Sequence, residues 1–224
     1  MASETDSAAI LPDETEARAA FVLALRRSGV GAHAVLSAIE RVPRRLFLPA
    51  RHHSLAYADS PLPIECGQVV SAPSFVARVV EALDIEPHHR VLEVGTGSGY
   101  QAAVLGHLAA RVDSVDRYKT LTGLAAQRIA ALKIETVAFH HADGLAGLKS
   151  HAPFDRIVLT GAVADVPEVL SGQLTPDGVL IAPLGAPGGV QHLTRISWAS
   201  GTEQRTTIDT ARLVALTPGR AKRL

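Results

Sequence analysis

The stretch that decides the fold is Val91-Leu92-Glu93-Val94-Gly95-Thr96-Gly97-Ser98-Gly99-Tyr100. It opens with a short β-rich run, continues with three alternating glycines, and enters a helical pattern at Tyr100. Glycine permits a tight turn and lets a ligand approach the backbone, because no Cβ stands in the way. A helix that starts directly after such a loop offers unpaired N–H groups. The stretch therefore predicts a strand, a ligand-binding loop and a helix.

The spacing of these glycines excludes three common loops. A dinucleotide-binding fingerprint needs glycine at position 100, where Tyr100 stands. A phosphate-binding P-loop needs a Gly-Lys-Ser/Thr step, which the sequence lacks. A nucleophile elbow centred on Ser98 needs glycine in place of Thr96. The remaining pattern, Glu-x-Gly-x-Gly-x-Gly, resembles the nucleoside-binding loop of class I S-adenosylmethionine (SAM)-dependent methyltransferases.

Two acidic residues further along the chain support a nucleoside site. Asp116 ends the strand pattern that follows the glycine loop, and Asp143-Gly144 follows the next one. In a doubly wound sheet the first of these carboxylates lies beside the glycine loop, where it can accept hydrogen bonds from both ribose hydroxyls. Either acid alone is more simply explained as a solvated loop residue. Together with the glycine loop, they predict a cofactor site.

Strand and helix patterns alternate around this stretch. Short β-rich runs cover 90–94, 111–116, 136–140, 155–160 and 179–184, and helical patterns cover 100–110 and 118–132. Such alternation predicts βαβ units. Gln191–Trp198 and Thr206–Leu216 indicate two further strands without a helix between them. We therefore expect an α/β fold: a doubly wound, Rossmann-like methyltransferase sheet, mostly parallel, with an antiparallel C-terminal hairpin and helices on both faces.

The first third of the chain has a different character. Residues 1–13 show no periodicity and are expected to be disordered. Helices are predicted at Thr15–Arg27 and 32–41, followed by an irregular loop at 50–73, a length that is usually functional. The expected organisation is a single methyltransferase domain at 14–224, with a helical cap and substrate loop at 14–73 and the core at 74–224.

Composition narrows the class of protein. The chain has 224 residues, of which 47% are hydrophobic, enough for a continuous core. Lys+Arg and Asp+Glu both number 22, a balance that argues against a dedicated nucleic-acid binder. Cys66 is the only cysteine, which excludes an intrachain disulfide and a cysteine-rich zinc site. No apolar run approaches the roughly 18 residues of a membrane span, and the acidic N-terminus does not read as a signal peptide. We expect no membrane association and a cytoplasmic location.

Three segments before the glycine loop carry a more specific similarity. Val42–Pro49 follows the pattern V-P-R-x-x-F-x-P, Tyr57–Ile64 follows Y-x-D-x-P-L-P-I, and Gly67–Pro73 approximates G-Q-T-I-S-x-P. In this order they resemble the protein-L-isoaspartate O-methyltransferase family. Further counterparts follow at Phe154–Thr160, Leu174–Gly178, Leu184–Gln191 and Leu213–Thr217, so the resemblance spans about 15–217.

The resemblance implies a reaction. Enzymes of this family transfer a methyl group from SAM to the side-chain carboxylate of an L-isoaspartyl residue in a damaged protein or peptide, and the ester then collapses to a succinimide. A carboxylate is already ionised at neutral pH, so this chemistry needs no general base. The enzyme must hold the oxygen in line with the methyl carbon and exclude water from both.

The resemblance also implies site residues. Ser71 matches the active-site serine, and we assign it a role as hydrogen-bond donor to the acceptor carboxylate, since a serine nucleophile would need a partnered base. A structural alternative is that Ser71 caps the helix that starts near Pro73. The implied cofactor-binding residues are Val69, Val70, Glu93, Gly95, Thr96, Gly97, Gly99, Asp116, Asp143, Gly144 and Thr217. No metal is implied.

Three positions depart from the family pattern. Val69 replaces a threonine, Glu65 a glycine and Ala215 a proline. They surround the expected substrate region and leave the cofactor loop intact. They keep open a second hypothesis, a relative that methylates ordinary aspartate in a dedicated peptide substrate. A third hypothesis is a noncatalytic SAM-binding protein, against which the intact Ser71 and glycine loop argue.

The remaining reactive residues receive no functional assignment. The histidine pairs His52-His53, His88-His89 and His140-His141 are expected to be solvated surface residues, because neighbours on a strand point in opposite directions. Cys66 is expected to be an apolar filler of the substrate loop, and the basic residues at 220–223 a solvated end. The sequence leaves open which proteins are methylated and whether the chain forms oligomers.

Overall fold

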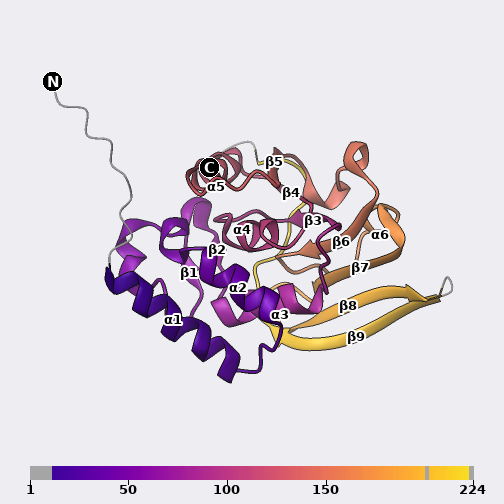
Figure 1. The fold of residues 1–224 in the computed structure, drawn as a ribbon. Helices are drawn as coiled ribbons and strands as arrows, with labels where there is room; N and C mark the ends of the chain where they lie inside the picture. The colour runs from indigo at the N-terminus through magenta and orange to yellow at the C-terminus, as the bar shows by residue number, and fades with distance from the viewer. Residues whose placement is uncertain (1–11, 200–201, 222–224) are drawn as a thin grey trace.

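The computed structural model describes residues 12–199 and 202–221 (Figure 1). Helix α1 (Pro12–Arg27) starts at Pro12 rather than at Thr15, and α2 (His33–Arg41) lies where a helix was predicted. Residues 1–11, most of the segment expected to be disordered, lie outside the described residues. None of the described helices is both long enough and apolar enough to cross a membrane.

A seven-stranded sheet forms the centre of the molecule, in the order β5-β4-β3-β6-β7-β8-β9. The strands from β5 to β7 are parallel, while β8 and β9 run antiparallel to their neighbours. This arrangement confirms the predicted mostly parallel sheet with an antiparallel C-terminal hairpin. The strands are β3 (Arg90–Val94), β4 (Arg111–Asp116), β5 (Val137–His141), β6 (Phe154–Leu159), β7 (Leu174–Leu184), β8 (Gln191–Ala199) and β9 (Thr202–Ala211).

Helices cover both faces of the sheet, as predicted, but unequally. Val91 of β3 belongs to a hydrophobic cluster that also holds residues of α1, α2, α3 (Pro73–Ala82), α4 (Tyr100–Gly106) and α5 (Lys119–Ala131). Leu92 and Val94 point to the opposite face and pack with Leu170 of the short helix α6 (Glu168–Ser171). Alternating side chains of a single strand therefore build two separate hydrophobic layers.

Several element boundaries differ from the sequence prediction, and three of the differences are explained by backbone contacts. Strand β7 begins at Leu174 rather than 179, because Leu174 pairs with Phe154 at the start of β6. Strand β9 ends at Ala211, and the following residues leave the hairpin because Ala215 forms a parallel bridge with Ala162. Helix α4 ends at Gly106 rather than 110, since the Ala110 N–H already bonds to the His89 carbonyl beside the sheet.

The 50–73 segment is not the irregular loop that we predicted. It contains 3₁₀ helices at Ala50–Leu55 and Glu65–Gly67 and a two-stranded antiparallel sheet of β1 (Leu62–Pro63) and β2 (Val69–Val70). Leu62 and Val70 are buried. Strands of two residues have no alternation that a sequence pattern could reveal. We refer to residues 56–71, which belong to the segment expected to hold the substrate, as the substrate loop.

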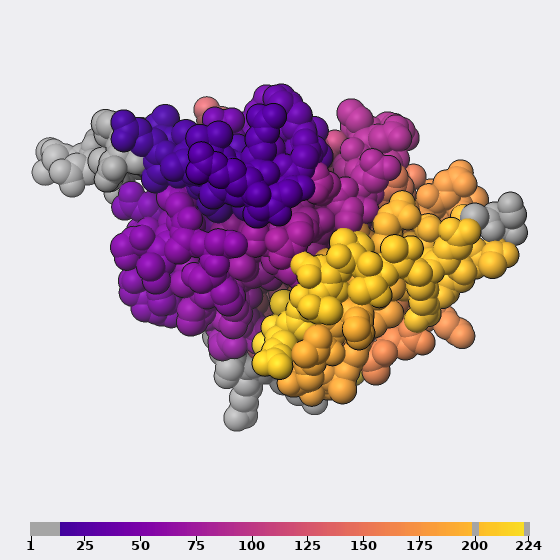
Figure 2. All heavy atoms as spheres, turned by 90° about the horizontal axis from the view of Figure 1, so that it is seen from below, coloured from indigo at the N-terminus to yellow at the C-terminus, as the bar shows by residue number. Residues whose placement is uncertain are grey.

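The N-terminal helices and the C-terminal hairpin lie side by side on one face of the molecule (Figure 2). Arg78 of α3 donates from Nε to Asp209 Oδ2 of β9 at 2.8 Å. Residues far apart in the sequence therefore pack together along this face. The carboxyl ends of the parallel strands face a different part of the surface, where a cleft lies.

Candidate active site

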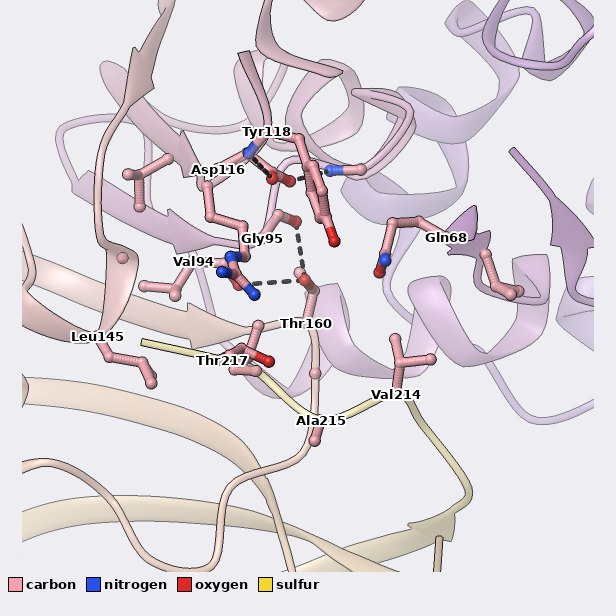
Figure 3. A pocket seen from close by; sticks show the side chains of 17 residues that line it. Gln68, Val94, Gly95, Asp116, Tyr118, Leu145, Thr160, Val214, Ala215 and Thr217 are labelled. Atoms are coloured by element: carbon pink, nitrogen blue, oxygen red, sulfur yellow. Dashed lines mark hydrogen bonds between the residues drawn. The ribbon is translucent and has the colours of Figure 1, made fainter. Parts of the chain in front are cut away.

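The cleft lies where the strand order reverses. Strands β4 and β5 are on one side of β3, and β6 and β7 are on the other. Open α/β sheets bind ligands at such switch points, outside the carboxyl ends of the strands. The cleft encloses about 690 Å³, a volume that includes the space open to solvent at its mouth. Figure 3 shows Gly95, Asp116 and Thr160 at its centre.

The glycine loop adopts a conformation that other residues rarely take. Gly95, Gly97 and Gly99 have φ angles of 101°, 53° and 87°. A Cβ on Gly95 would overlap Thr160 Oγ1, and one on Gly99 would lie 2.7 Å from the Cβ of Ala125. Thr160 Oγ1 donates to the Gly95 carbonyl at 2.7 Å and so fixes the loop to the end of β6. Both backbone geometry and space therefore require glycine here.

Asp116 holds the loop from the other side. Its Oδ2 accepts from the Gly97 N–H at 3.0 Å, and its Oδ1 accepts from the Tyr118 N–H at 2.9 Å (Figure 3). Burial raises the pKa of this carboxyl, and the backbone hydrogen bonds offset part of the effect. Each oxygen keeps acceptor capacity for a further donor. Asp116 lines the cleft, as predicted, and can offer that capacity to a ligand hydroxyl.

A second cavity of about 380 Å³ adjoins the cleft and contains Ser71. Val69, Gly95, Gly97 and Thr160 line both spaces. The second cavity also brings together residues of the substrate loop, of β3 and of α4: Val70, Ser71, Glu93, Thr96, Tyr100 and Gln101. The structure therefore places the candidate catalytic serine beside the glycine loop.

The alternative role of Ser71 as a helix cap is wrong. The N-cap position of α3 is Ala72, whose side chain has no capping oxygen. Asp59 Oδ1 accepts from the Ser74 N–H at 2.9 Å and satisfies the first turn instead. The carboxylate that caps this helix thus lies well before it in the sequence. The hydroxyl of Ser71 is not needed for this purpose.

Glu93 is completely buried at the end of β3. Ser114 Oγ donates to its Oε2 at 2.6 Å, and Gln101 Nε2 donates to its Oε1 at 3.1 Å. Burial raises the pKa of Glu93 to about 8, because the hydrogen bonds compensate only part of the lost hydration. The free protein therefore holds a carboxyl beside the glycine loop that is mostly protonated at neutral pH.

The other predicted cofactor residues divide into two groups. Gly144 and Thr217 line the cleft. Gly99 and Asp143 line neither cavity. Asp143 Oδ1 accepts from the Leu145 N–H at 3.0 Å, and its Oδ2 accepts from the Gly219 N–H at 2.7 Å. In the described structure Asp143 ties the C-terminal segment to the turn after β5.

Several residues of the cleft were missed by the sequence analysis. Thr160 and Gly161 follow β6 directly, so the carboxyl-edge argument that found Asp116 would have found them too. Tyr118 lies two residues beyond Asp116 and faces the cleft. The missed residues are Gln68, Val94, Val115, Arg117, Tyr118, Leu145, Thr160, Gly161, Val214 and Leu216. Val214 and Leu216 lie in the Leu213–Thr217 segment that resembles the family, but we assigned them to a strand and chose only Thr217 as a site residue.

Glu65 and Cys66 lie next to the site without lining either cavity. Glu65 Oε1 lies 3.6 Å from Arg128 Nη2, and Arg128 Nη1 donates to the Ser98 carbonyl at 3.0 Å. The Glu65 carboxylate therefore points toward the guanidinium of Arg128 in α5. Burial and nearby Asp116 raise the pKa of the Cys66 thiol, which disfavours the reactive thiolate.

Two of the histidine predictions are wrong. His89 is buried, and its Nδ1 accepts from the Glu86 N–H at 2.8 Å. His140 Nε2 and His151 Nδ1 both contact Oδ1 of the buried Asp113, at 2.8 and 3.0 Å. This group has the residue types of a metal site. Arg111 already bonds both Asp113 oxygens, at 3.0 and 3.1 Å, so the carboxylate is satisfied by protein donors.

The sheet order, the left-handed glycine loop and the acid at the end of β4 define a class I SAM-dependent methyltransferase. Comparison of the sequence with models of known protein families identifies the family. The model of the protein-L-isoaspartate(D-aspartate) O-methyltransferase family matches residues 16–221. The chain belongs to this family.

Individual relatives agree with the family assignment. The protein-L-isoaspartate O-methyltransferase of Azorhizobium caulinodans is 49% identical over 96% of this chain and 97% of its own length. That of Xanthobacter autotrophicus is 47% identical over 94% and 96%. A solved protein-L-isoaspartate O-methyltransferase superimposes with a TM-score of 0.81 at 27% identity, covering 88% of this chain and 65% of that one.

A second solved structure supports the fold. It is a putative protein-L-isoaspartate O-methyltransferase from Plasmodium falciparum in complex with S-adenosyl-L-homocysteine. It has a TM-score of 0.76 at 23% identity and covers 88% of this chain and 97% of that one. SAM is the methyl donor of the family to which the chain belongs.

Gly95→Ala is expected to lower the free energy of unfolding by about 2–4 kcal/mol, from backbone strain and overlap with Thr160. Urea unfolding measures this change. Gly123→Ala in α5 is the matched control, because a Cβ there meets open space. It should be neutral or stabilise by up to about 1 kcal/mol. Equal effects of the two substitutions would contradict the constraint assigned to the loop.

Glu93→Gln is expected to stabilise the protein increasingly as the pH rises. The pKa of Glu93 is about 8 in the folded protein, against an ordinary value of 4.5. Between these two pH values the folded state binds a proton that the unfolded state has lost, so the wild type becomes less stable as the pH rises through this range. Below pH 4.5 both states are protonated and the effect is absent. Urea unfolding at pH 5 and pH 8 should show an advantage of the variant that grows by roughly 2–4 kcal/mol. The exposed Glu135→Gln is the control and should show no such growth.

Proposed function

We propose that this protein transfers the methyl group of SAM to the side-chain carboxylate of L-isoaspartyl residues in proteins or peptides and so initiates their repair through a succinimide. One observation carries the proposal beyond family membership. Ser71, in the segment that resembles the family signature, lines the same cavity as Glu93 and the glycine loop. A methyl donor in the cleft and an acceptor beside Ser71 would therefore meet where the two cavities join.

The residues present fit SAM. The glycine loop leaves room for a close backbone approach, and Asp116 keeps acceptor capacity for the ribose hydroxyls. Glu93 is a buried carboxyl whose bonded neighbours are the neutral Ser114 and Gln101. A cationic ligand beside it would stabilise the ionised form of this carboxyl. Bound SAM would provide an electrophilic methyl group on a positively charged sulfur.

The protein's own residues have modest chemical tasks in this reaction. The acceptor carboxylate arrives ionised, so no residue has to remove a proton. In one displacement the carboxylate oxygen bonds to the methyl carbon as the carbon–sulfur bond breaks and its electron pair stays on sulfur. Ser71 donates a hydrogen bond that orients the carboxylate, and Val69 and Val70 keep water away from the reacting atoms.

The structure bears on the choice between isoaspartate and ordinary aspartate. Glu65, one of the departures that motivated the second alternative, pairs with Arg128 and lines neither cavity. It therefore does not place a negative charge against an anionic substrate. Val69 and Ala215 do line the cleft, but both are small and uncharged. Family membership favours the isoaspartyl substrate, and the placement of Glu65 removes one objection to a carboxylate substrate of either kind.

The proposal includes a cytoplasmic reaction with protein or peptide partners. The single cysteine fits a reducing compartment. The balanced charge gives no electrostatic reason to expect nucleic acid as a partner.

Labelled SAM should yield a base-labile ester on an isoaspartyl peptide and none on the matched aspartyl peptide. Ser71→Ala should reduce kcat/KM for the isoaspartyl peptide about 10- to 100-fold, because a hydrogen bond to a charged group contributes roughly 1.5–3 kcal/mol. Ser150→Ala, at an exposed position, should leave it unchanged. Equal labelling of both peptides would favour the ordinary-aspartate alternative, and no labelling would favour a noncatalytic protein.

SAM binding at pH 7 should release up to one proton, because a cation beside Glu93 favours its ionised form and lowers its pKa from about 8. The affinity should therefore rise as the pH increases toward 8. Calorimetry in two buffers of different ionisation enthalpy measures the released protons. S-adenosylhomocysteine, which lacks the sulfonium charge, should release fewer. Undiminished proton release by Glu93→Gln would show that Glu93 is not the group involved.

A further inference from the structure

Arg44 is the largest fully buried side chain in the described structure, and it is charged. It lies in a 3₁₀ helix (Arg44–Phe47) ahead of the substrate loop. Arginine is almost never buried completely unless it is paired. Arg45, the next residue of the same helix, keeps 37% of its side chain exposed. The burial of Arg44 therefore needs an explanation from its contacts.

The guanidinium of Arg44 bonds three backbone carbonyls. Nη1 donates to the Ala56 carbonyl at 2.8 Å, and Nη2 donates to those of Ser60 and Ser71 at 3.3 and 3.2 Å. These acceptors are the first, a middle and the last residue of the substrate loop. The Arg44 side chain thus connects three distant points of the substrate loop, and one of them is Ser71, the residue proposed to orient the substrate.

The described residues give Arg44 no ion-pair partner. The nearby carboxylate of Asp59 accepts a hydrogen bond from the Ser74 N–H instead. Arg44 Nε is buried without a hydrogen-bond partner, and burial lowers the pKa of the guanidinium. A buried charge whose hydrogen bonds go only to backbone carbonyls is costly. An apolar side chain would fill the same space without this cost, so filling space does not account for arginine.

Arg44 also contacts the other half of the site. Its Cζ lies 5.8 Å from the centre of the Tyr100 ring. Tyr100 is the first residue of α4, directly after the glycine loop, and it lines the same cavity as Ser71. The guanidinium is therefore placed between the loop that carries Ser71 and the start of the helix that follows the glycine loop.

We propose that Arg44 is a positioning residue for methyl transfer, which fixes the backbone of Ser71 relative to the glycine loop. This inference rests on the proposed function. A shift of about 1 Å in the position of a reacting group can cost a factor of about 100 in rate. Lysine would keep the charge, but it presents its donors from one nitrogen and cannot span the acceptors that arginine reaches from two.

The test compares Arg44→Lys with Arg45→Lys. Kinetics with an isoaspartyl peptide are measured well below the melting temperature. Each rate is divided by the concentration of sites that bind S-adenosylhomocysteine, which calorimetric titration measures. Arg44→Lys should lower kcat/KM for the peptide about 10- to 100-fold, while its Kd for S-adenosylhomocysteine stays within about threefold. Arg45→Lys, the matched control on the same helix, should stay within about twofold in both.

Two outcomes would overturn the proposal. One is unchanged peptide kinetics in Arg44→Lys. The other is a fall in activity that disappears after normalisation, which would make Arg44 a folding residue only. If Arg44→Lys binds no S-adenosylhomocysteine at all, Arg44→Gln is assayed in the same way and decides between these results. Failure of the proposed function itself is distinguishable, because the wild type would then not methylate the isoaspartyl peptide.

Discussion

The site depends on a backbone bend that only glycine can hold. Gly95, Gly97 and Gly99 all have positive φ, and the bend is fixed by Thr160 on one side and Asp116 on the other. These two residues come from the carboxyl ends of β4 and β6, the strands on either side of β3, so the sheet order determines where the bend can form. The two cavities share this bend as a common wall. In the proposed function, a methyl donor in the cleft and an acceptor in the second cavity would meet at this wall.

The elements around the bend could be predicted from the sequence because each has a local cause. Alternating strand and helix patterns predicted that β3, β4, β5 and β6 are parallel, though not their order, and the strand pair without a helix predicted the C-terminal hairpin. The glycine loop and Asp116 are separated by one helix, so their meeting follows from a single βαβ unit. The resemblance of the segment around Ser71 then located the substrate loop, although not its short strands.

Other features could not be predicted because contacts between distant segments determine them. The sequence identifies Asp143 as an acid at the right edge, but not that Gly219 bonds one of its oxygens. Nothing in the sequence indicates that His140 and His151 share a partner, but in the fold both contact Asp113 of β4. Arg44 is similar, because its acceptors are carbonyls, which carry no residue signature. In each case the residue type shows what can be donated or accepted, while only the fold shows the partner.

The cleft is lined by segments that are far apart in the sequence, because Gln68 precedes the glycine loop while Val214 and Thr217 lie near the C-terminus (Figure 3). A nucleoside bound there would contact both segments, so the bound state forms only when both are folded. Binding of the nucleoside therefore raises the free energy of unfolding of the whole protein, because only the folded state binds it. Scarcity of the methyl donor would therefore lower both the reaction rate and the resistance of the protein to heat and proteolysis.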